Sequence, residues 1–459
     1  MPESLADLTA TDLVAKYRAG DLSPVQVIED VLSRVEALEP HLCATYALDP
    51  DAARQAARDS EARYLRHEPA GPLDGVPVTV KENIATRGTP VPQGTAATEL
   101  IPAKEDAPAA ARLREAGAVL FSKTTMSEYG MLSSGVSTFH HLARNPWDLS
   151  KTPGGSSAGA AAAAAAGYGP IHLGTDIGGS IRLPAGWCGV VGLKPTHGRV
   201  AVGNPYPGRA IGPITRTAAD AALTLQVISG PDRRDHTSLP PLPETNEPFD
   251  PKGLTIALLL DAGLGLPVDP EITAAVTNAA LTLESAGAKL TQIPPIVTRE
   301  MLTGLDHFWR VRSAVDIAAL PEDRRAKVLP AIREWTSTAA DLTPYDVFRG
   351  YSQMQAMATA VDQAFASYDA ILSPTAPIPA FPADLAYPTG NPLEPFEHIA
   401  FTVPYNMSTH PALTVNCGWT TTGLPIGLQI AAPRFKDQTT LHLAAYLEAV
   451  LPTKPWPAL

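Results

Sequence analysis

Apolar residues at helical spacing mark the first part of the chain. After Ser23 they recur every three or four positions, at Val27, Ile28, Val31, Leu32, Val35 and Leu38. Ser23 and Gln26 form the pattern of an N-terminal capping box for this helix. Gly20 predicts the end of an earlier helix, and "PDAARQAARDSEARYL" predicts another helix over residues 50–65. We therefore expect a helical N-terminal segment at about residues 1–65.

Short β-branched runs bounded by turns follow this helical segment. The run "GVPVTVKENI" predicts a strand that enters the core, and "APAAARLREAGAVLFSKTT" predicts a helix, a glycine cap and a second strand. Helices that alternate with strands in this way imply parallel pairing. The alanine tract in "SSAGAAAAAAAGYGPIHLGTD" predicts a helix of small residues packed closely against a neighbour, followed by the strand "PIHLGTD".

The alternation continues in the second half of the chain. We predict a strand at "LTIALLLD", a helix over 270–289, largely helical structure over 301–366, and late strands at "PALTVNCGW" and "GLPIGLQIAAP". Residues 229–253 are rich in Pro, Asp and Glu without periodicity, which predicts a surface connection. Because there are no internal repeats, the elements favour one mixed α/β domain over residues 1–459.

The charge balance narrows the classes of partner. Lys and Arg number 35 against 47 Asp and Glu, which gives a net charge of -12. Binding to nucleic acid or to an anionic membrane surface needs clustered positive charge, so we expect neither partner. The cysteines, Cys43, Cys188 and Cys417, lie far apart and show no metal-ligand spacing. They are typical of free thiols in a reducing compartment.

The beginning of the sequence shows no signal-peptide pattern. It has no basic region followed by an apolar run. Apart from the alanine tract, nothing approaches 18 apolar residues without a charge or a helix breaker. We therefore expect no membrane span and a cytoplasmic location.

A lysine at the end of a predicted strand is the first candidate for chemistry. Lys81 follows the apolar run "VPVTV", so its ammonium would enter a site of low dielectric. Burial disfavours the charged form and lowers the pKa of a lysine, which turns the amine into a base. The local sequence equally allows a lysine that reaches back to solvent, or one that pairs with Glu82.

The second candidate is "GGSSAG", residues 154–159, at the start of the predicted alanine helix. The alternative to a catalytic role is that Ser156 or Ser157 only caps this helix. The letters "GSSAG" also match the G-x-S-x-G elbow of other hydrolases, with Ser157 as nucleophile. That elbow requires a hydrophobic strand directly before it, whereas "NPWDLSKTPG" is a loop, so we reject this interpretation.

The third candidate is the stretch "GTDIGGSIR", residues 174–182. Two glycines allow the backbone to turn tightly in front of Ser180 and to direct several N–H groups at one point, which is what an oxyanion hole needs. Asp176 and Arg182 bracket the turn and are placed to pair with each other. A purely structural turn is the alternative.

Several separate motifs resemble the amidase signature family. The long stretch from "TPGGSSAG" through "GTDIGGSIRLPAGWCGVVGLKPTHGRV" is similar to its serine- and glycine-rich signature. The runs "GVPVTVKENI", "LREAGAVLFSKTTMSEYG", "ARNPWD", "YDAILSPTAPIPA" and "GLPIGLQIAAP" occur in the family's order. The resemblance covers about residues 60–435. It implies the family's α/β fold, a single large mixed β-sheet core covered by helices on both faces.

The resemblance also implies roles for individual residues. The family uses a serine nucleophile, a bridging serine on a cis peptide bond, and a lysine. At the matching positions these are Ser180, Ser156 and Lys81. The implied oxyanion hole consists of the backbone of Ile177, Gly178, Gly179 and Ser180. The implied supporting residues are Ser157, Asp176 and Arg182.

The function that the resemblance implies is hydrolysis of a carboxylic amide C–N bond in small aliphatic or aromatic amides. The reaction would proceed through an acyl-enzyme on Ser180, without a metal or an organic cofactor. Two alternatives stay open. One is a carbamate- or ester-preferring hydrolase on the same residues. The other is the glutaminase-like subunit of a tRNA-dependent amidotransferase, which works with partner subunits.

The expected partner is a small-molecule amide, and the sequence leaves open whether the chain forms a homodimer. Candidates for the substrate pocket are Met126, Tyr129 and Met131, together with residues 304–313. These side chains favour an apolar or aromatic acyl group.

Overall fold

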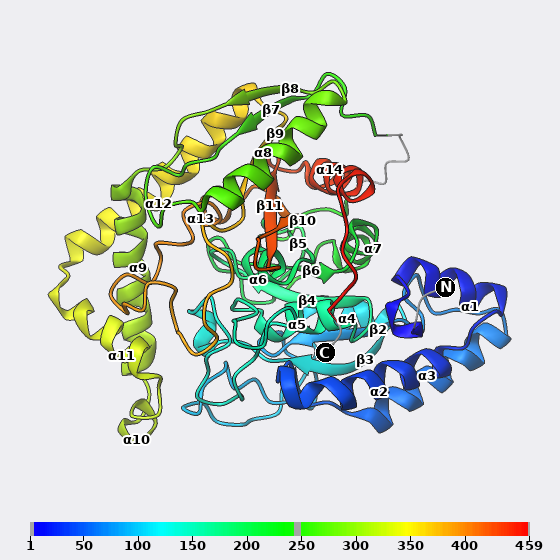
Figure 1. The fold of residues 1–459 in the computed structure, drawn as a ribbon. Coiled ribbons are helices and arrows are strands. Elements are labelled where there is room, and N and C mark those ends of the chain that lie inside the picture. The colour runs from blue at the N-terminus through cyan, green and yellow to red at the C-terminus, as the bar shows by residue number, and fades with distance from the viewer. Residues whose placement is uncertain (1–3, 243–248, 458–459) are drawn as a thin grey trace.

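An eleven-stranded mixed sheet runs through the described part of the computed structural model, residues 4–242 and 249–457 (Figure 1). The strands lie in the order β1-β3-β2-β4-β6-β5-β10-β11-β9-β7-β8. Their bounds are β1 Thr45–Tyr46, β2 Pro77–Lys81, β3 Val119–Thr124, β4 Ile171–Asp176, β5 Val191–Lys194, β6 Ala210–Thr215, β7 Thr255–Leu258, β8 Lys289–Gln292, β9 Ala370–Pro374, β10 Ala412–Trp419 and β11 Pro425–Ala431.

Strand direction decides which residues meet at one edge. β2 is parallel to both of its neighbours, β3 and β4, whereas β4 is antiparallel to β6 on its other side. Parallel strands end at the same edge of a sheet. Lys81, the last residue of β2, therefore lies beside the end of β4, at Thr175 and Asp176.

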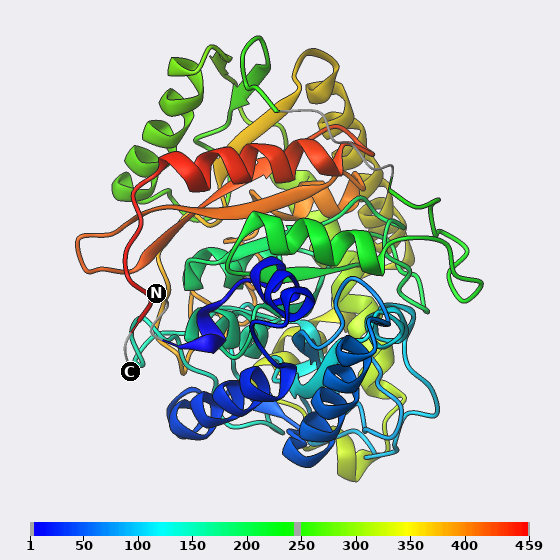
Figure 2. The same ribbon diagram turned by 90° about the vertical axis from the view of Figure 1, so that its right-hand side faces the viewer.

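Helices cover both faces of the sheet, as the resemblance implies. Their bounds are α1 Ala10–Ala19, α2 Pro24–Leu42, α3 Pro50–Leu65, α4 Pro108–Glu115, α5 Ala158–Ala166, α6 Arg182–Cys188, α7 Ala218–Ile228, α8 Pro270–Ser285, α9 Arg299–Ala318, α10 Glu322–Arg325, α11 Pro330–Ser337, α12 Pro344–Ala364, α13 Val403–Met407 and α14 Asp437–Val450. On one face α7 and α14 lie side by side, and α4 and α8 share their core (Figure 2). α5, α6 and α13 pack on the opposite face.

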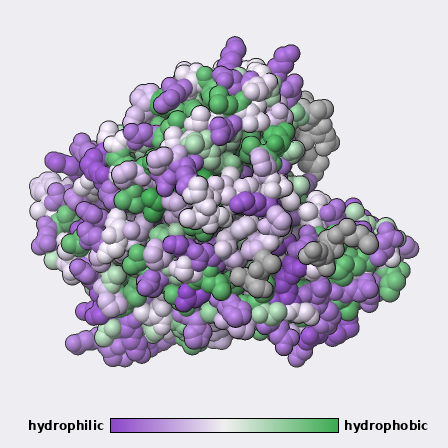
Figure 3. All heavy atoms as spheres, viewed as in Figure 1, coloured by the Kyte–Doolittle hydropathy of each residue, from purple (hydrophilic) through white to green (hydrophobic). Residues whose placement is uncertain are grey.

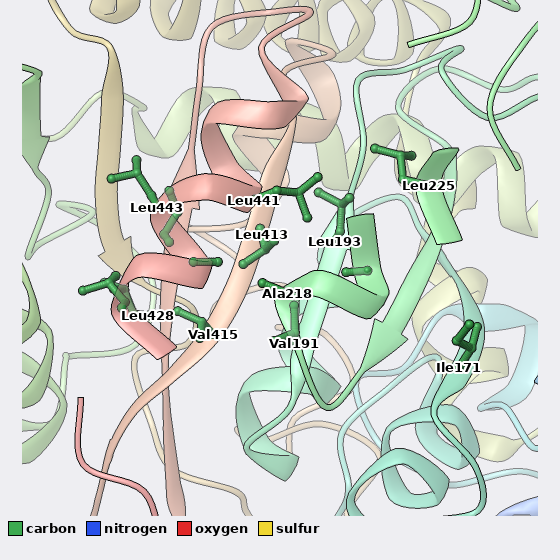
Figure 4. Packing of buried hydrophobic residues seen from close by; sticks show 14 of the residues in the cluster. Ile171, Val191, Leu193, Ala218, Leu225, Leu413, Val415, Leu428, Leu441 and Leu443 are labelled. Atoms are coloured by element: carbon green, nitrogen blue, oxygen red, sulfur yellow. The ribbon is translucent and has the colours of Figure 1, made fainter. Parts of the chain in front are cut away.

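The period-two pattern of the strands divides their side chains between these two layers. In β11, for example, Leu428 and Ile430 join the core beneath α7 and α14, whereas Ala431 faces the core that contains α13. Figure 4 shows Leu441 and Leu443 of α14 close to Leu413 and Leu428 of the sheet. Burial of these side chains on both faces is the main force that holds the sheet and helices together.

The alanine helix α5 is buried along its whole length. It is small enough to lie directly against its neighbours, and at Gly159 even a methyl group would overlap the Ala44 carbonyl and the Thr125 backbone. The predicted close packing of small residues is thus confirmed. The helix carries no functional side chain of its own, and it fixes the position of the loop directly before it.

Most predicted elements are confirmed, including the capping box of α2 and the helix over 50–65. The helix predicted over 270–289 ends earlier, at Ser285, because Gly287 has a positive φ of 99° and the chain then enters β8. α14 is an element that the sequence did not predict. Of the predicted surface connection, residues 243–248 lie outside the described residues, and 229–242 and 249–253 contain no helix or strand.

The surface is largely polar on the face drawn in Figure 3, where hydrophobic residues are scattered among hydrophilic ones. None of the described helices combines the length and the apolar composition that crossing a bilayer requires.

Candidate active site

Lys81 is fully buried, and three hydroxyl groups surround its amine. Nζ lies 2.7 Å from Ser156 Oγ, 3.0 Å from Ser157 Oγ and 2.9 Å from Thr175 Oγ1. The parallel pairing of β2 and β4 explains the contact with Thr175, because Lys81 is the last residue of β2 and Thr175 the last but one of β4. Two of the three predicted catalytic side chains, Lys81 and Ser156, thus lie in direct contact.

The alternative in which Lys81 pairs with Glu82 is not what the structure shows. The Glu82 carboxylate is also buried, but it accepts hydrogen bonds from the backbone N–H groups of Gln93 and Gly94 at 2.5 and 2.8 Å. His140 Nε2 lies 2.6 Å from the same carboxylate. Glu82 therefore shapes the loop beside the site and leaves the Lys81 amine to the hydroxyl groups.

The two serines before α5 do not cap that helix. Ser157 occupies the N-cap position without a side-chain capping bond, and the peptide bond between Gly155 and Ser156 is cis. Ser157 Oγ instead accepts from the Thr175 N–H and donates to the Thr175 carbonyl, both at 3.3 Å. The Ser157 N–H donates to the Ser180 carbonyl at 3.2 Å, so the serine loop is tied to the glycine turn.

One backbone N–H group of the glycine turn is bound within the turn itself, and three others are not. Gly179 has a φ of +127°, and its N–H donates to Asp176 Oδ1 at 2.8 Å. Ile177, Gly178 and Ser180 line the neighbouring cavity, and within the described part of the chain their N–H groups have no acceptor. The implied oxyanion hole therefore needs one correction, because the N–H of Gly179 is already bound.

Glycine is required at position 179 for steric reasons as well. A Cβ there would lie 2.5 Å from Thr402 Oγ1 and 2.9 Å from Leu183 Cδ1. Thr402 Oγ1 also donates to the Gly178 carbonyl at 2.6 Å, which holds the outer side of the turn.

Asp176 and Arg182 form a fully buried ion pair beneath the turn, as their positions in the sequence suggest. Arg182 Nε and Nη2 donate to the Asp176 carboxylate at 3.1 and 3.0 Å. The same guanidinium donates to the Thr402 carbonyl at 2.9 Å and to Gln429 Oε1 at 2.7 Å, and it also binds Asn406. The pair thus joins β4, α6, α13 and β11. Burial alone would raise the pKa of Asp176, but Arg182 and the surrounding donors hold it well below its usual range.

Burial lowers the pKa of Lys81 to about 7. The negative charges of Asp176 and Glu82 oppose this shift, and the positive charge of Arg209 adds to it. Both carboxylates have other hydrogen-bond partners, so neither sits against the amine. A substantial fraction of Lys81 is then neutral near pH 7 and can accept a proton.

A cavity opens above the turn and contains Ser180. Tyr129 and Met131 line it as predicted, but Met126 does not, because it is packed in the interior behind Gly130. Trp309, Arg312 and Ser313 of the stretch 304–313 also line it. Sequence reasoning missed the lining residues Arg209, Trp335, Phe396 and Ile399.

Thr175 is a further residue that sequence reasoning missed. Its position next to Asp176, at the end of a strand parallel to that of Lys81, was the available signal. Among the described residues, no three His, Cys, Asp or Glu side chains are grouped so that they could hold a metal ion.

Comparison with known proteins agrees with this geometry. The family model described as Amidase matches residues 26–441. The chain belongs to the amidase signature family. It is 36% identical to an acylamidase of Rhodococcus erythropolis, over 99% of this chain and 97% of that protein. It is also 36% identical to a glutamyl-tRNA(Gln) amidotransferase subunit of Myxococcus xanthus (strain DK1622), over 97% of both chains.

Solved structures of amidase signature enzymes share the fold. A bacterial aryl acylamidase of the family superimposes with a TM-score of 0.86 at 27% identity, covering 98% of this chain and 97% of that chain. The 6-aminohexanoate cyclic dimer hydrolase complexed with substrate gives 0.86 at 28% identity, with 98% of both chains covered. This amidase signature chain is accordingly a hydrolase of C–N amide bonds.

The buried ion pair yields a stability prediction. Arg182→Met leaves the Asp176 carboxylate buried without its cation, so the free energy of unfolding should fall by about 3–5 kcal/mol. Urea denaturation measures this loss. Arg54→Met is the control, because Arg54 pairs with Glu29 at the exposed surface and its removal should hardly move the unfolding midpoint. Equal effects of the two substitutions would contradict the importance of the buried pair.

Proposed function

We propose that this chain acts alone as an amidase that cleaves a carboxylic amide through an acyl-enzyme on Ser180. The observation that carries the proposal is the buried Lys81 amine, which contacts Ser156 at 2.7 Å beside a turn whose Ser180 lines a cavity. A serine hydroxyl is a weak nucleophile at neutral pH and needs a base, and Ser-Lys pairs of this kind are one solution.

The hydrogen bonds around Lys81 support one direction of proton transfer. A neutral amine has two N–H donors and one lone pair, so it can donate to two hydroxyls and accept from the third. The Ser157 hydroxyl has an acceptor in the Thr175 carbonyl at 3.3 Å. The Thr175 hydroxyl accepts from Asn83 Nδ2 at 3.1 Å and has a long contact of 3.5 Å with Asn83 Oδ1. Ser156 Oγ lies nearest to the amine, so in the proposed scheme its proton goes to Lys81.

Ser156 then takes the proton of Ser180 as Ser180 Oγ attacks the carbonyl carbon. In this scheme the developing oxyanion is stabilised by the N–H groups of Ile177, Gly178 and Ser180, three residues that line the cavity. The Lys81 ammonium returns its proton through Ser156 to the leaving amine, and the C–N bond breaks. Water releases the acid from the acyl-enzyme by the same relay in reverse.

The amidotransferase subunit is a second candidate, because subunits of that name are as similar to this chain as the acylamidase is. A glutaminase-like subunit would act within a complex, whereas an amidase is active as purified. The net charge of -12 supports the stand-alone enzyme, since it disfavours direct binding of tRNA.

The proposal predicts that the purified chain alone hydrolyses simple amides and is labelled by a fluorophosphonate at Ser180. Ser180→Ala should abolish turnover and labelling. Ser157→Ala is the control and should keep the label, because Ser157 is buried and does not line the cavity. Label on Ser157 in peptide mapping, or activity only with a copurified partner, would contradict the proposal.

The lowered pKa of Lys81 predicts the pH dependence. Below its pKa the amine is protonated and cannot act as base, so kcat/KM for an uncharged amide should rise with pH through a midpoint near 7. Lys194 is a matched control, because burial also lowers its pKa to about 7, while among the described residues its amine donates to the Pro195 carbonyl alone. Lys194→Met should leave the midpoint in place. A midpoint near the usual lysine value would refute a neutral Lys81.

A further inference from the structure

Two arginines line the cavity that contains Ser180. Arg209 directly precedes β6 and Arg312 lies in α9, and both are half-buried. Within the described residues neither guanidinium forms an ion pair with a carboxylate. Arg209 donates one hydrogen bond, to the Asn204 carbonyl at 3.3 Å, and Arg312 Nε is buried without a partner. The cavity thus holds two cations whose charge the protein does not neutralise.

The two guanidiniums also lie close to each other. Both stack on the ring of Tyr206, with their central carbons 5.5 Å and 4.8 Å from its centroid. Burial and the neighbouring charge of Arg312 lower the pKa of Arg209. A guanidinium nevertheless keeps its charge in a protein, so the repulsion persists unless an anion is bound.

Further polar groups in the same cavity have no partner. Trp309 Nε1 and Ser313 Oγ are buried and make no hydrogen bond to any described residue, although both residues line the cavity. A buried helical hydroxyl ordinarily donates to the carbonyl four residues earlier, as Thr336 does to Ile332 at 2.8 Å. Buried polar groups are rarely left unpaired, so a cluster of them at one cavity indicates a missing ligand.

The composition of the lining defines that ligand. Among the described residues, the lining includes no Asp or Glu. Apart from the polar groups above, it is formed mainly by apolar and aromatic side chains such as Trp335, Phe396 and Ile399. A carboxylate has two oxygens that accept several hydrogen bonds, and it matches the planar fork of arginine. A cationic amide would meet two like charges here.

We infer that the substrate is an amide that carries a carboxylate, which Arg209 and Arg312 bind while the amide carbonyl lies at Ser180. The inference rests on the proposed function, because it assigns the substrate class of the same site. Arg312 and Arg209 are then specificity-determining residues. The apolar lining holds the body of the substrate between its two polar ends.

Matched substrates test the inference. Adipic acid monoamide carries a carboxylate in its acyl part, and hexanamide is the matched amide without it. 4-Acetamidobenzoate carries a carboxylate in its amine part, and acetanilide is the matched amide without it. In at least one pair the carboxylate should raise kcat/KM at least tenfold. Arg312→Gln and, independently, Arg209→Gln should reduce that preference at least tenfold, and Arg312→Lys should restore part of it. Arg349→Gln removes an exposed arginine of α12 and should not change the preference.

A binding measurement separates this inference from the proposed function. Titration calorimetry with benzoate and benzamide on Ser180→Ala protein needs no turnover. If benzoate binds more tightly than benzamide, and this difference is lost in Ser180→Ala/Arg312→Gln, the carboxylate site is supported even if no amide is hydrolysed. Hydrolysis of amides without preference for a carboxylate, with benzoate binding no tighter than benzamide, would overturn the inference and leave the amidase proposal standing.

Discussion

The buried ion pair between Asp176 and Arg182 is the interaction on which the candidate site depends. Neither side chain is exposed to solvent, and each has its hydrogen-bonding groups engaged by the other or by nearby groups. The Asp176 carboxylate accepts the N–H groups of Gly179 and Ile181, which bends the backbone into the turn. Ile177, Gly178 and Ser180 of this turn line the cavity. An isolated charge could not be buried at this depth, because the free energy lost on desolvation would exceed the free energy gained from an incomplete set of contacts.

At Lys81, too, the cost of burying a charge is set against the contacts available to it, but here no carboxylate among the described residues pairs with the charge. Its amine is as deeply buried as Arg182, but it has hydroxyl groups around it instead of a carboxylate. Hydroxyls satisfy a neutral amine as well as a charged one, since each can donate or accept. Burial therefore lowers the pKa of Lys81 to about 7, whereas Arg182 is held in an ion pair with Asp176. The two buried basic side chains thus differ in their surroundings, one among hydroxyl groups and the other against a carboxylate.

Features that depend on local sequence could be predicted, and features that depend on distant segments could not. The capping box at Ser23, the strand that ends in Lys81 and the pairing of Asp176 with Arg182 lie within a few residues of their signals. The partners of Arg182 at Asn406 and Gln429 are more than 220 residues away, and only the order of the strands brings them near. Met126 was predicted to line the pocket from its residue type alone. The structure buries it behind Gly130, which depends on how the chain packs there. Arg312 lies in the stretch 304–313 that was expected near the pocket, whereas Arg209 carries no local signal and meets Arg312 only through the fold.

The central claim is that Lys81 first accepts the Ser180 proton and then returns it to the leaving amine. An amine anion leaves only when protonated, whereas nitrophenolate leaves without a proton. One acyl group presented as an amide and as a nitrophenyl ester therefore separates the two steps. In Lys81→Ala, kcat/KM should fall by at least about tenfold more for the amide than for the ester. Equal losses on both substrates, or activity near that of the unaltered enzyme, would contradict the account.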